Sequence, residues 1–144
     1  MCDPVAGEAE ADRFQQVIPD LEIQNASRVL VCTGKIGHDL RQERTRRKDA
    51  STAIVFLEQL YPFPSQELEA EFARHSNARE IVWVQEEPAN MGAQYFIMPK
   101  LRHLTGETRM RSVKRSASAS PATGSHKAFE MEQQALLNLA FASF

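Results

Sequence analysis

The sequence predicts an α/β fold in which a mainly parallel sheet carries helices on both faces. Three apolar runs, residues 28–32, 52–57 and 80–85, have the length of strands and lack polar alternation, as strands buried on both faces do. Each run leads through a turn into helix-forming sequence, and repeated β-α units imply parallel strands with right-handed crossovers. The carboxyl ends of these strands are therefore expected at one edge, where open α/β sheets bind their ligands.

Composition sets the size and class of the protein. The 144 residues are enough for one domain with a modest core. Hydrophobic residues make up 42% and charged residues 25%, as in an ordinary globular domain. The net charge of -2 argues against a general nucleic-acid binder, and no apolar run approaches the roughly 20 residues of a membrane span. We therefore expect neither nucleic acid nor membrane as a partner.

The cysteines and histidines predict neither a disulfide nor a metal site. Cys2 lies in a tail and Cys32 ends a predicted buried strand, so both are expected as free thiols in a reducing compartment. The four histidines are scattered through separate elements, and no Cys/His spacing suits a metal ion. The acidic N-terminal residues have neither the features of a secretory signal nor those of a mitochondrial transit peptide.

Residues 1–27 are expected to form an N-terminal arm or a linker from a preceding domain. They are acidic, and only sporadic apolar residues interrupt them before the turn-like residues 24–27. The α/β domain is then predicted over residues 28–144. Whether Met1 is a true start is left open.

The first half of this domain is expected to contain two β-α units. The strand at 28–32 turns into a helix at 37–48, whose last turn is basic, as suits the C-terminal end of the helix dipole. The strand at 52–57 leads into residues 58–64, where two prolines predict a rigid extended connection. Ser65 is expected to cap the next helix.

The second half continues the pattern. The helix that starts at Ser65 is expected to bury Leu68 and Phe72 and to end at Asn77. The strand at 80–85 precedes a helix at 92–104 that is predicted to kink or end near Pro99. Trp83 is most simply a core residue.

A weaker strand and a long helix close the chain. Residues 109–115 form the weaker strand candidate, and the small residues of 116–124 are expected to form an ordered loop. Ser125 can cap the last helix, which is amphipathic and runs to about Phe141.

Four segments directly follow predicted strands and should meet at one edge: residues 33–35, 58–64, 85–92 and 115–124. Thr33-Gly34-Lys35 can hold an anion at a helix start, or it is simply a tight turn, and it lacks the P-loop pattern. Together with Arg115, Lys35 is the most credible cation for contacting a ligand.

Glu86 and Glu87 are adjacent carboxylates at the end of a strand. Such a pair suggests general acid–base chemistry, but neighbouring strand residues point to opposite sides. No histidine or cysteine nearby completes a catalytic set, and no nucleophile elbow is present among the serines. A structural or interface role is therefore favoured for at least one of them, and no catalytic residue is predicted.

Four motifs in order carry a family resemblance: VLVCTGKIGHDL, VFLEQLYPFP, REIVWVQEEPANMGAQ and SASASPATGSHKAFEMEQQ. Over about residues 13 to 142 the chain resembles the C-terminal region of the thiamine-dependent first component of 2-oxoglutarate dehydrogenase. The resemblance implies a transketolase C-terminal-like three-layer sandwich, often with one antiparallel edge strand. The intact subunit decarboxylates 2-oxoglutarate in the tricarboxylic acid cycle and transfers succinyl to a lipoyl group of the succinyltransferase component.

The resemblance also implies where cofactors and effectors belong. In the family, thiamine diphosphate and Mg²⁺ are held by upstream domains, so this chain alone is expected to hold no cofactor and no metal and to be non-catalytic. The C-terminal domain supports subunit packing and in some relatives binds nucleotide-type or acyl-CoA effectors. The candidate effector-binding positions are Thr33, Lys35, Gln85, Glu86, Asn90 and Arg115.

The chain departs from the family at three places. Gly37-His38 stand where two aromatic residues are usual, Gln94 stands where an aromatic residue is common, and Lys114-Arg115-Ser116 replace a Gly-Arg-Pro. Fewer aromatic side chains weaken stacking against a purine or a neighbouring domain.

The leading hypothesis is thus a structural and regulatory C-terminal domain of a multienzyme-complex subunit. Its expected partners are the upstream domains, a homodimer partner and the succinyltransferase component, in the mitochondrial matrix or in a bacterial cytoplasm. The alternative is a stand-alone α/β module that binds a nucleotide or an acyl-CoA. A third hypothesis, the equivalent domain of a transketolase or a pyruvate dehydrogenase, is disfavoured by the QEEPANMG and SASASPATG segments.

Overall fold

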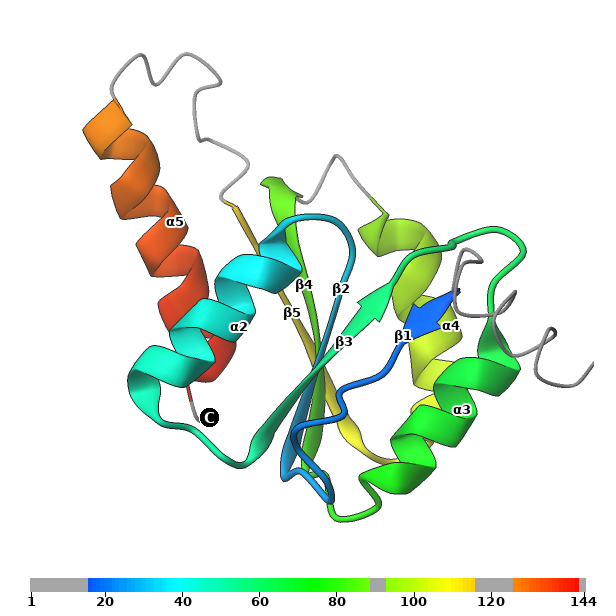
Figure 1. The fold of residues 1–144 in the computed structure, drawn as a ribbon. Coiled ribbons are helices and arrows are strands. Elements are labelled where there is room, and N and C mark those ends of the chain that lie inside the picture. The colour runs from blue at the N-terminus through cyan, green and yellow to red at the C-terminus, as the bar shows by residue number, and fades with distance from the viewer. Residues whose placement is uncertain (1–15, 89–92, 116–125, 143–144) are drawn as a thin grey trace, which may run out of the picture.

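In the part of the chain that the structure describes, nine elements surround or form one five-stranded sheet with the order β1-β3-β2-β4-β5 (Figure 1). The computed structural model describes residues 16–88, 93–115 and 126–142. In chain order the elements are β1 (Val17–Ile18), β2 (Arg28–Cys32), α2 (Ile36–Arg47), β3 (Thr52–Leu57), α3 (Ser65–Arg74), β4 (Glu80–Pro88), α4 (Gln94–Thr105), β5 (Arg109–Arg115) and α5 (His126–Phe141).

The sheet is parallel except at one edge. β2 pairs in parallel with both β3 and β4, and β4 pairs in parallel with β5. Arg28 lies opposite Thr52 on one side and Glu80 on the other, so the central strands begin in line. β1 is the antiparallel edge strand beside β3. The prediction of an α/β fold with a mainly parallel sheet is confirmed.

The two faces of the sheet carry two separate hydrophobic cores. Because side chains alternate along a strand, Leu30 packs toward α2 and α5, whereas Val29 and Val31 pack toward α3 and α4 (Figure 1). Leu40 of α2 and Leu68 of α3 are fully buried on these two faces. Burial of each such leucine contributes roughly 2 kcal/mol. Helices on both faces complete the three layers.

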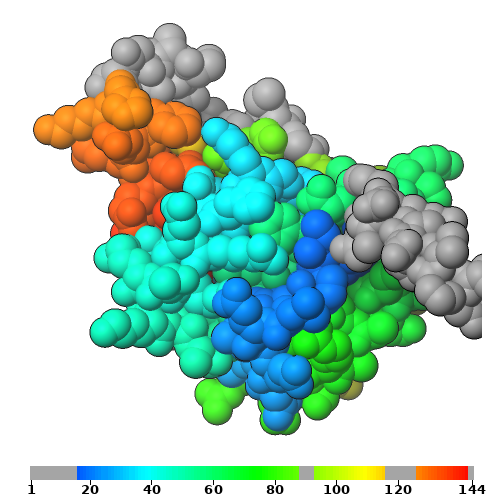
Figure 2. Space-filling model, in the orientation of Figure 1, coloured from blue at the N-terminus to red at the C-terminus, as the bar shows by residue number. Residues whose placement is uncertain are grey.

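Residues 16–27 pack against the domain instead of leading away from it. Val17 and Ile18 extend the sheet, and Asp20 and Ala26 are buried. Figure 2 shows this segment lying between α2 and α3. The predicted arm therefore contributes to the folded body along its second half, while the boundary at residue 28 stays a prediction.

Two helix boundaries differ from those predicted. Ser65 does not cap α3 with its side chain, because it is already the first helical residue and Pro64 occupies the N-cap. α3 also ends at Arg74, before Asn77, with the backbone N–H of His75 donating to the carbonyl of Phe72.

α4 continues through Pro99 to Thr105, so of the two predicted outcomes, a kink or an end near this proline, the end is not found. A proline removes one helix hydrogen bond to the carbonyl four residues earlier. That residue is the exposed Tyr95, where water can satisfy the carbonyl.

The remaining predicted elements agree in position, with Arg28–Cys32, Thr52–Leu57 and Arg109–Arg115 found as strands. The loop at 116–124 and the proposed cap Ser125 lie outside the described residues. None of the helices in the described ranges is long and apolar enough to cross a membrane.

Candidate functional site

The candidate site is the edge of the sheet at which the four parallel strands end. The carboxyl ends of β2, β3, β4 and β5 lie along this edge, as the sequence predicted (Figure 1). Of the four predicted segments, 33–35 and 58–64 are described, whereas most of 85–92 and of 115–124 after the strands lies outside the described residues. Gly34 turns the chain from β2 into α2 with a φ of +80°, a left-handed conformation that favours glycine. Lys35 then occupies the N-cap of α2 with its side chain exposed, and Thr33 is half-buried on the other side of the turn.

Gln85 holds the end of β4 together. It is 1% exposed, and its Oε1 accepts a hydrogen bond of 2.8 Å from the indole N–H of Trp83. Its amide nitrogen donates to the backbone carbonyl of Glu87 at 3.0 Å. Because both ends of this amide are bonded within the protein, Gln85 shapes the edge, and its role in binding an effector stays a prediction.

Glu86 and Glu87 lie on opposite sides of the sheet, in agreement with strand alternation. The half-buried Glu86 faces α5 and accepts a hydrogen bond of 3.2 Å from Gln133. Glu87 is exposed and lines a groove on the side of α4. The two carboxylates therefore cannot act together on one reacting atom.

A polar cluster joins the end of β5 to α5. Arg115 forms an ion pair of 2.8 Å with Glu132, donates to Oε1 of Gln133 at 2.6 Å and lies 4.9 Å above the ring of Phe129. The amide nitrogen of Gln133 also donates to Asp39 of α2 at 2.9 Å. Gln133 thus links three elements, a role that helical spacing alone did not reveal.

The described candidate effector positions are divided between the two faces of the sheet. Thr33 borders the groove beside α4, and the buried Gln85 bonds to Trp83 of the same groove. Glu86 and Arg115 lie on the α5 side of the sheet. Asn90 lies outside the described residues.

A groove with a volume of about 460 Å³ lies beside α4 at this edge. Its lining comes from β2, β4, the loop after β3 and the start of α4. Most of this lining is apolar: Thr33, Leu60, Tyr61, Trp83, Glu87, Ala93 and Phe96. The aromatic residues at the rim of this groove were not predicted from the sequence. Tyr61 in the proline-rich connection is the signal that could have indicated them.

A phenylalanine from β3 fills the space beside the start of α2. A Cβ atom at Gly37 would lie 2.3 Å from the ring of Phe56, so glycine permits this close packing. The ring of His38 lies 5.2 Å from that of Phe56, between centroids, and the guanidinium of Arg41 lies 4.5 Å from the same centroid. In this chain the phenyl ring beside the start of α2 therefore comes from Phe56 of β3, and not from a residue at position 37 of the helix.

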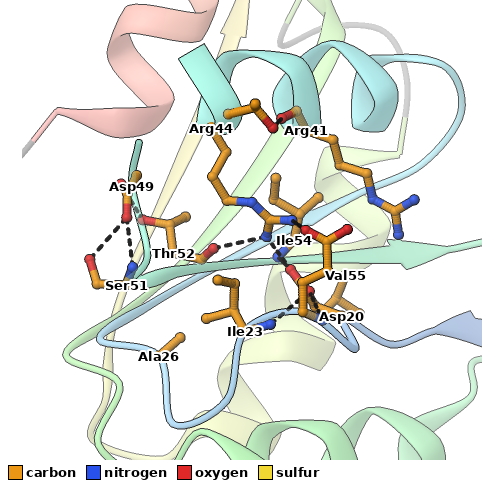
Figure 3. Close-up of polar contacts among 12 residues, drawn as sticks. Asp20, Ile23, Ala26, Arg41, Arg44, Asp49, Ser51, Thr52, Ile54 and Val55 are labelled. Carbon is orange, nitrogen blue, oxygen red and sulfur yellow. Dashed lines mark hydrogen bonds and ion pairs between the residues drawn. The ribbon is translucent and has the colours of Figure 1, made fainter. Parts of the chain in front are cut away.

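A second polar cluster lies at the base of β3 and holds residues 20–23 in place (Figure 3). The carboxylate of Asp20 pairs with Arg44 and accepts the backbone N–H of Ile54 at 2.8 Å. Arg44 also donates to the carbonyl of Thr52 at 3.1 Å and to the carboxylate of Glu22 at 3.1 Å. Burial alone raises the pKa of Asp20, but the hydrogen bonds from Ile54 and Arg44 outweigh it and hold the pKa below its ordinary value.

A third cluster fastens the end of α5 to the sheet. Glu80 pairs with Arg28 at 2.8 Å and with Arg111 at 3.1 Å. The same two arginines donate to backbone carbonyls at the end of α5, including that of Phe141 at 2.9 Å from Arg28. Burial raises the pKa of Glu80, but the hydrogen bond and charge of Arg111 outweigh it, and the pKa is lowered. Cationic donors suit the negative end of a helix dipole.

Nowhere in the described ranges do three His, Cys, Asp or Glu residues gather as they would to hold a metal ion. Burial raises the pKa of the free Cys32 thiol to about 12, which keeps it protonated and unreactive.

The chain is similar in sequence to a known family and to curated proteins. Residues 6–141 match the family described as 2-oxoglutarate dehydrogenase C-terminal. The chain is 44% identical over 133 residues to the 2-oxoglutarate dehydrogenase E1 component of Cupriavidus necator, covering 90% of this chain and 14% of that protein. It is 35% identical over 133 residues to the 2-oxoadipate dehydrogenase complex component E1 of Danio rerio, covering 90% and 14%.

A solved structure shows the same fold. The chain superposes on a split gene transketolase, described as an inactive beta4 tetramer, with a TM-score of 0.58 and 14% sequence identity, covering 89% of this chain and 39% of that one. The predicted transketolase C-terminal-like architecture is thereby confirmed. The chain spans about 14% of the length of the curated relatives it matches.

Proposed function

Because the chain belongs to the 2-oxoglutarate dehydrogenase C-terminal family, we propose that it serves as the C-terminal structural and regulatory domain of an E1-type 2-oxo acid dehydrogenase. The observation that carries this proposal is the similarity to the Cupriavidus necator E1 component along nearly the whole of this chain. The substrate proposed for the intact enzyme is 2-oxoglutarate. A relative that acts in a 2-oxoadipate dehydrogenase complex makes 2-oxoadipate the second candidate.

The proposed enzyme decarboxylates its 2-oxo acid oxidatively and passes the acyl group to a lipoyl group of the partner acyltransferase. Thiamine diphosphate and Mg²⁺ are assigned to parts of the enzyme outside this chain. One feature supports a non-catalytic role for the chain itself: Glu86 and Glu87 face opposite sides of the sheet.

Two clusters of buried ion pairs support the structural role. The Asp20–Arg44 and Glu80–Arg111 clusters attach residues 20–23 and the end of α5 to the sheet. A rigid body of this kind provides a fixed surface for the domains that carry the chemistry. We assign as partners the upstream domains, a homodimer partner and the succinyltransferase component.

The regulatory role rests on the carboxyl edge of the sheet. Of the candidate effector positions, Lys35 is exposed at a helix start and Thr33 borders the groove, so these two are best placed to contact an acyl-CoA or a nucleotide. The compartment proposed is that of the whole enzyme, which is the mitochondrial matrix in a eukaryote or the cytoplasm in a bacterium.

A chimera tests the structural proposal. The matching C-terminal region of the Cupriavidus necator E1 component is replaced by this chain, and 2-oxoglutarate-dependent activity is compared with that of the same protein lacking the region. We expect activity in the chimera and none in the deletion. An inactive, aggregated chimera contradicts the proposal.

Two binding measurements complete the test. Calorimetry of the isolated chain with thiamine diphosphate and Mg²⁺ should give no heat of binding, and tight binding would overturn the non-catalytic role. Activation of the chimera by acetyl-CoA or AMP should weaken in Lys35→Ala, whereas Lys127→Ala, a change at an exposed lysine of α5, serves as the control.

A further inference from the structure

A second hollow of about 390 Å³ lies farther along α4 than the groove, between the loop before α3 and the later turns of α4. The amino group of Lys100, which lines this hollow, lies 4.8 Å from the ring centroid of Phe96 in the groove and 5.7 Å from that of Phe63 in the second hollow. The two hollows therefore adjoin at Lys100 and form one channel along α4. From Ala93 to Leu104 the channel follows α4 for about 17 Å, at 1.5 Å per residue.

Large apolar side chains at the rim of this channel remain exposed in the chain by itself. Tyr61 is 84% exposed, Tyr95 is 74% exposed and Phe96 is 39% exposed. Burying an aromatic side chain of this size contributes roughly 2 kcal/mol. Aromatic residues clustered around a concave surface are typical of the centre of an interface and not of a solvated face.

The two hollows of the channel differ in charge. Glu87 lines the groove near the sheet, and Lys100, with His103 beyond it, lines the second hollow. A segment that fills the channel therefore needs an apolar centre, a basic residue facing Glu87 and an acidic residue facing Lys100. About five extended residues or three helical turns have the required length.

We propose that this channel, named here the α4 channel, is the docking surface for an apolar polypeptide segment from the remainder of the E1-type enzyme. The inference rests on the proposed function, since about six sevenths of each matched relative lies outside the region that this chain spans. A second copy of this chain fits less well, because two concave channels placed face to face cannot fill one another.

Hydroxyl-radical footprinting tests the proposal on the chimera described above and on the isolated 144-residue chain, with the radical dose normalised by an added reporter peptide. We expect oxidation of Tyr61 and Phe96 to fall about fivefold or more in the chimera, as for side chains desolvated in an interface core. In the isolated chain their oxidation should not change with protein concentration.

A matched pair of variants adds a second measurement. Tyr61→Ser should lower the melting temperature of the chimera by several degrees more than that of the isolated chain, because Tyr61 contributes little to the fold alone. Leu139→Ser, a change at an exposed apolar residue on α5, is the control and should lack this difference.

The outcomes separate the two proposals. An active chimera in which Tyr61 and Phe96 are oxidised as fast as in the isolated chain overturns the docking surface and leaves the proposed function standing. Protection that instead rises with the concentration of the isolated chain assigns the α4 channel to contacts between copies and also overturns the inference. A chimera that never assembles overturns the proposed function together with this inference.

Discussion

Replacing Asp20 by asparagine should destabilise the fold strongly, although the shape of the side chain is kept. The carboxylate accepts backbone N–H groups from Glu22, Ile23 and Ile54 and pairs with Arg44. An amide has one oxygen in place of two and no charge. At least one of these donors is then left facing an NH₂ group in a buried place.

The magnitude follows from burial of the pair. The side chains of Arg44 and Asp20 are 5% and 2% exposed, so removing the carboxylate leaves a buried guanidinium with less compensation. Breaking such a pair from one side costs about 3–5 kcal/mol. Because the carbonyl of Thr52 and the carboxylate of Glu22 still accept from Arg44, we expect about 3 kcal/mol for Asp20→Asn, near the lower end of that range.

Urea unfolding followed by tryptophan fluorescence measures this loss directly, since Trp83 is the only tryptophan in the sequence and is fully buried. A loss of about 3 kcal/mol should lower the melting temperature by about 10 °C in a domain of this size. Glu22→Ala is the matched control. Glu22 also pairs with Arg44, but its side chain is 78% exposed, and an exposed ion pair contributes at most about 1 kcal/mol.

The reasoning is refuted if Asp20→Asn costs no more than Glu22→Ala. A double variant sharpens the test: Asp20→Leu combined with Arg44→Met removes both charges, and it should be more stable than Asp20→Leu alone. If the two are equally stable, the buried arginine is not what makes the single change costly.

Three further predictions concern the pH dependence at Asp20, the packing at Gly37 and the cluster around Glu80. The pKa of Asp20 is lower in the folded than in the unfolded protein, so its contribution to the free energy of unfolding is present above the unfolded pKa and is lost as the pH falls through the folded pKa. The urea midpoint should therefore fall more steeply on acidification in the wild type than in Asp20→Asn. Gly37→Ala should cost about 1–3 kcal/mol by overpacking against Phe56, and the cost should shrink in a Phe56→Leu background. Glu80→Gln should loosen the end of α5, seen as faster amide hydrogen exchange over its last turn, while exchange in α3 stays unchanged.

The sheet could be predicted because strands buried on both faces leave a plain signal. Residues 28–32 and 52–57 are apolar throughout, and both are strands with these bounds in the structure. Their order along the chain, with helices between them, is sufficient to place the carboxyl ends at one edge. The family resemblance then added the three-layer architecture and the antiparallel edge strand, which the strand β1 provides.

The contents of that edge could not be predicted in the same way. The contacts at this edge depend on the face of the sheet to which each side chain points. They also depend on which polar side chains the helix packed on that face places nearby. Gln85 was a candidate for binding but bonds to Trp83, and Arg115 was a candidate cation but pairs with Glu132 of α5. Both partners were visible in the sequence, but nothing in their spacing showed the contact.

The sequence by itself determined the fold, the family and the edge at which function is expected, because periodicity and ordered motifs are local properties of the chain. Only the tertiary structure decided that the segment around Asp20 belongs to the folded body and that Glu86 and Glu87 serve different faces. It alone showed the aromatic rim of the α4 channel around Tyr61 and Phe96. The physical reason is that burial and pairing are set by residues far apart in sequence, whose distances exist only once the layers have packed.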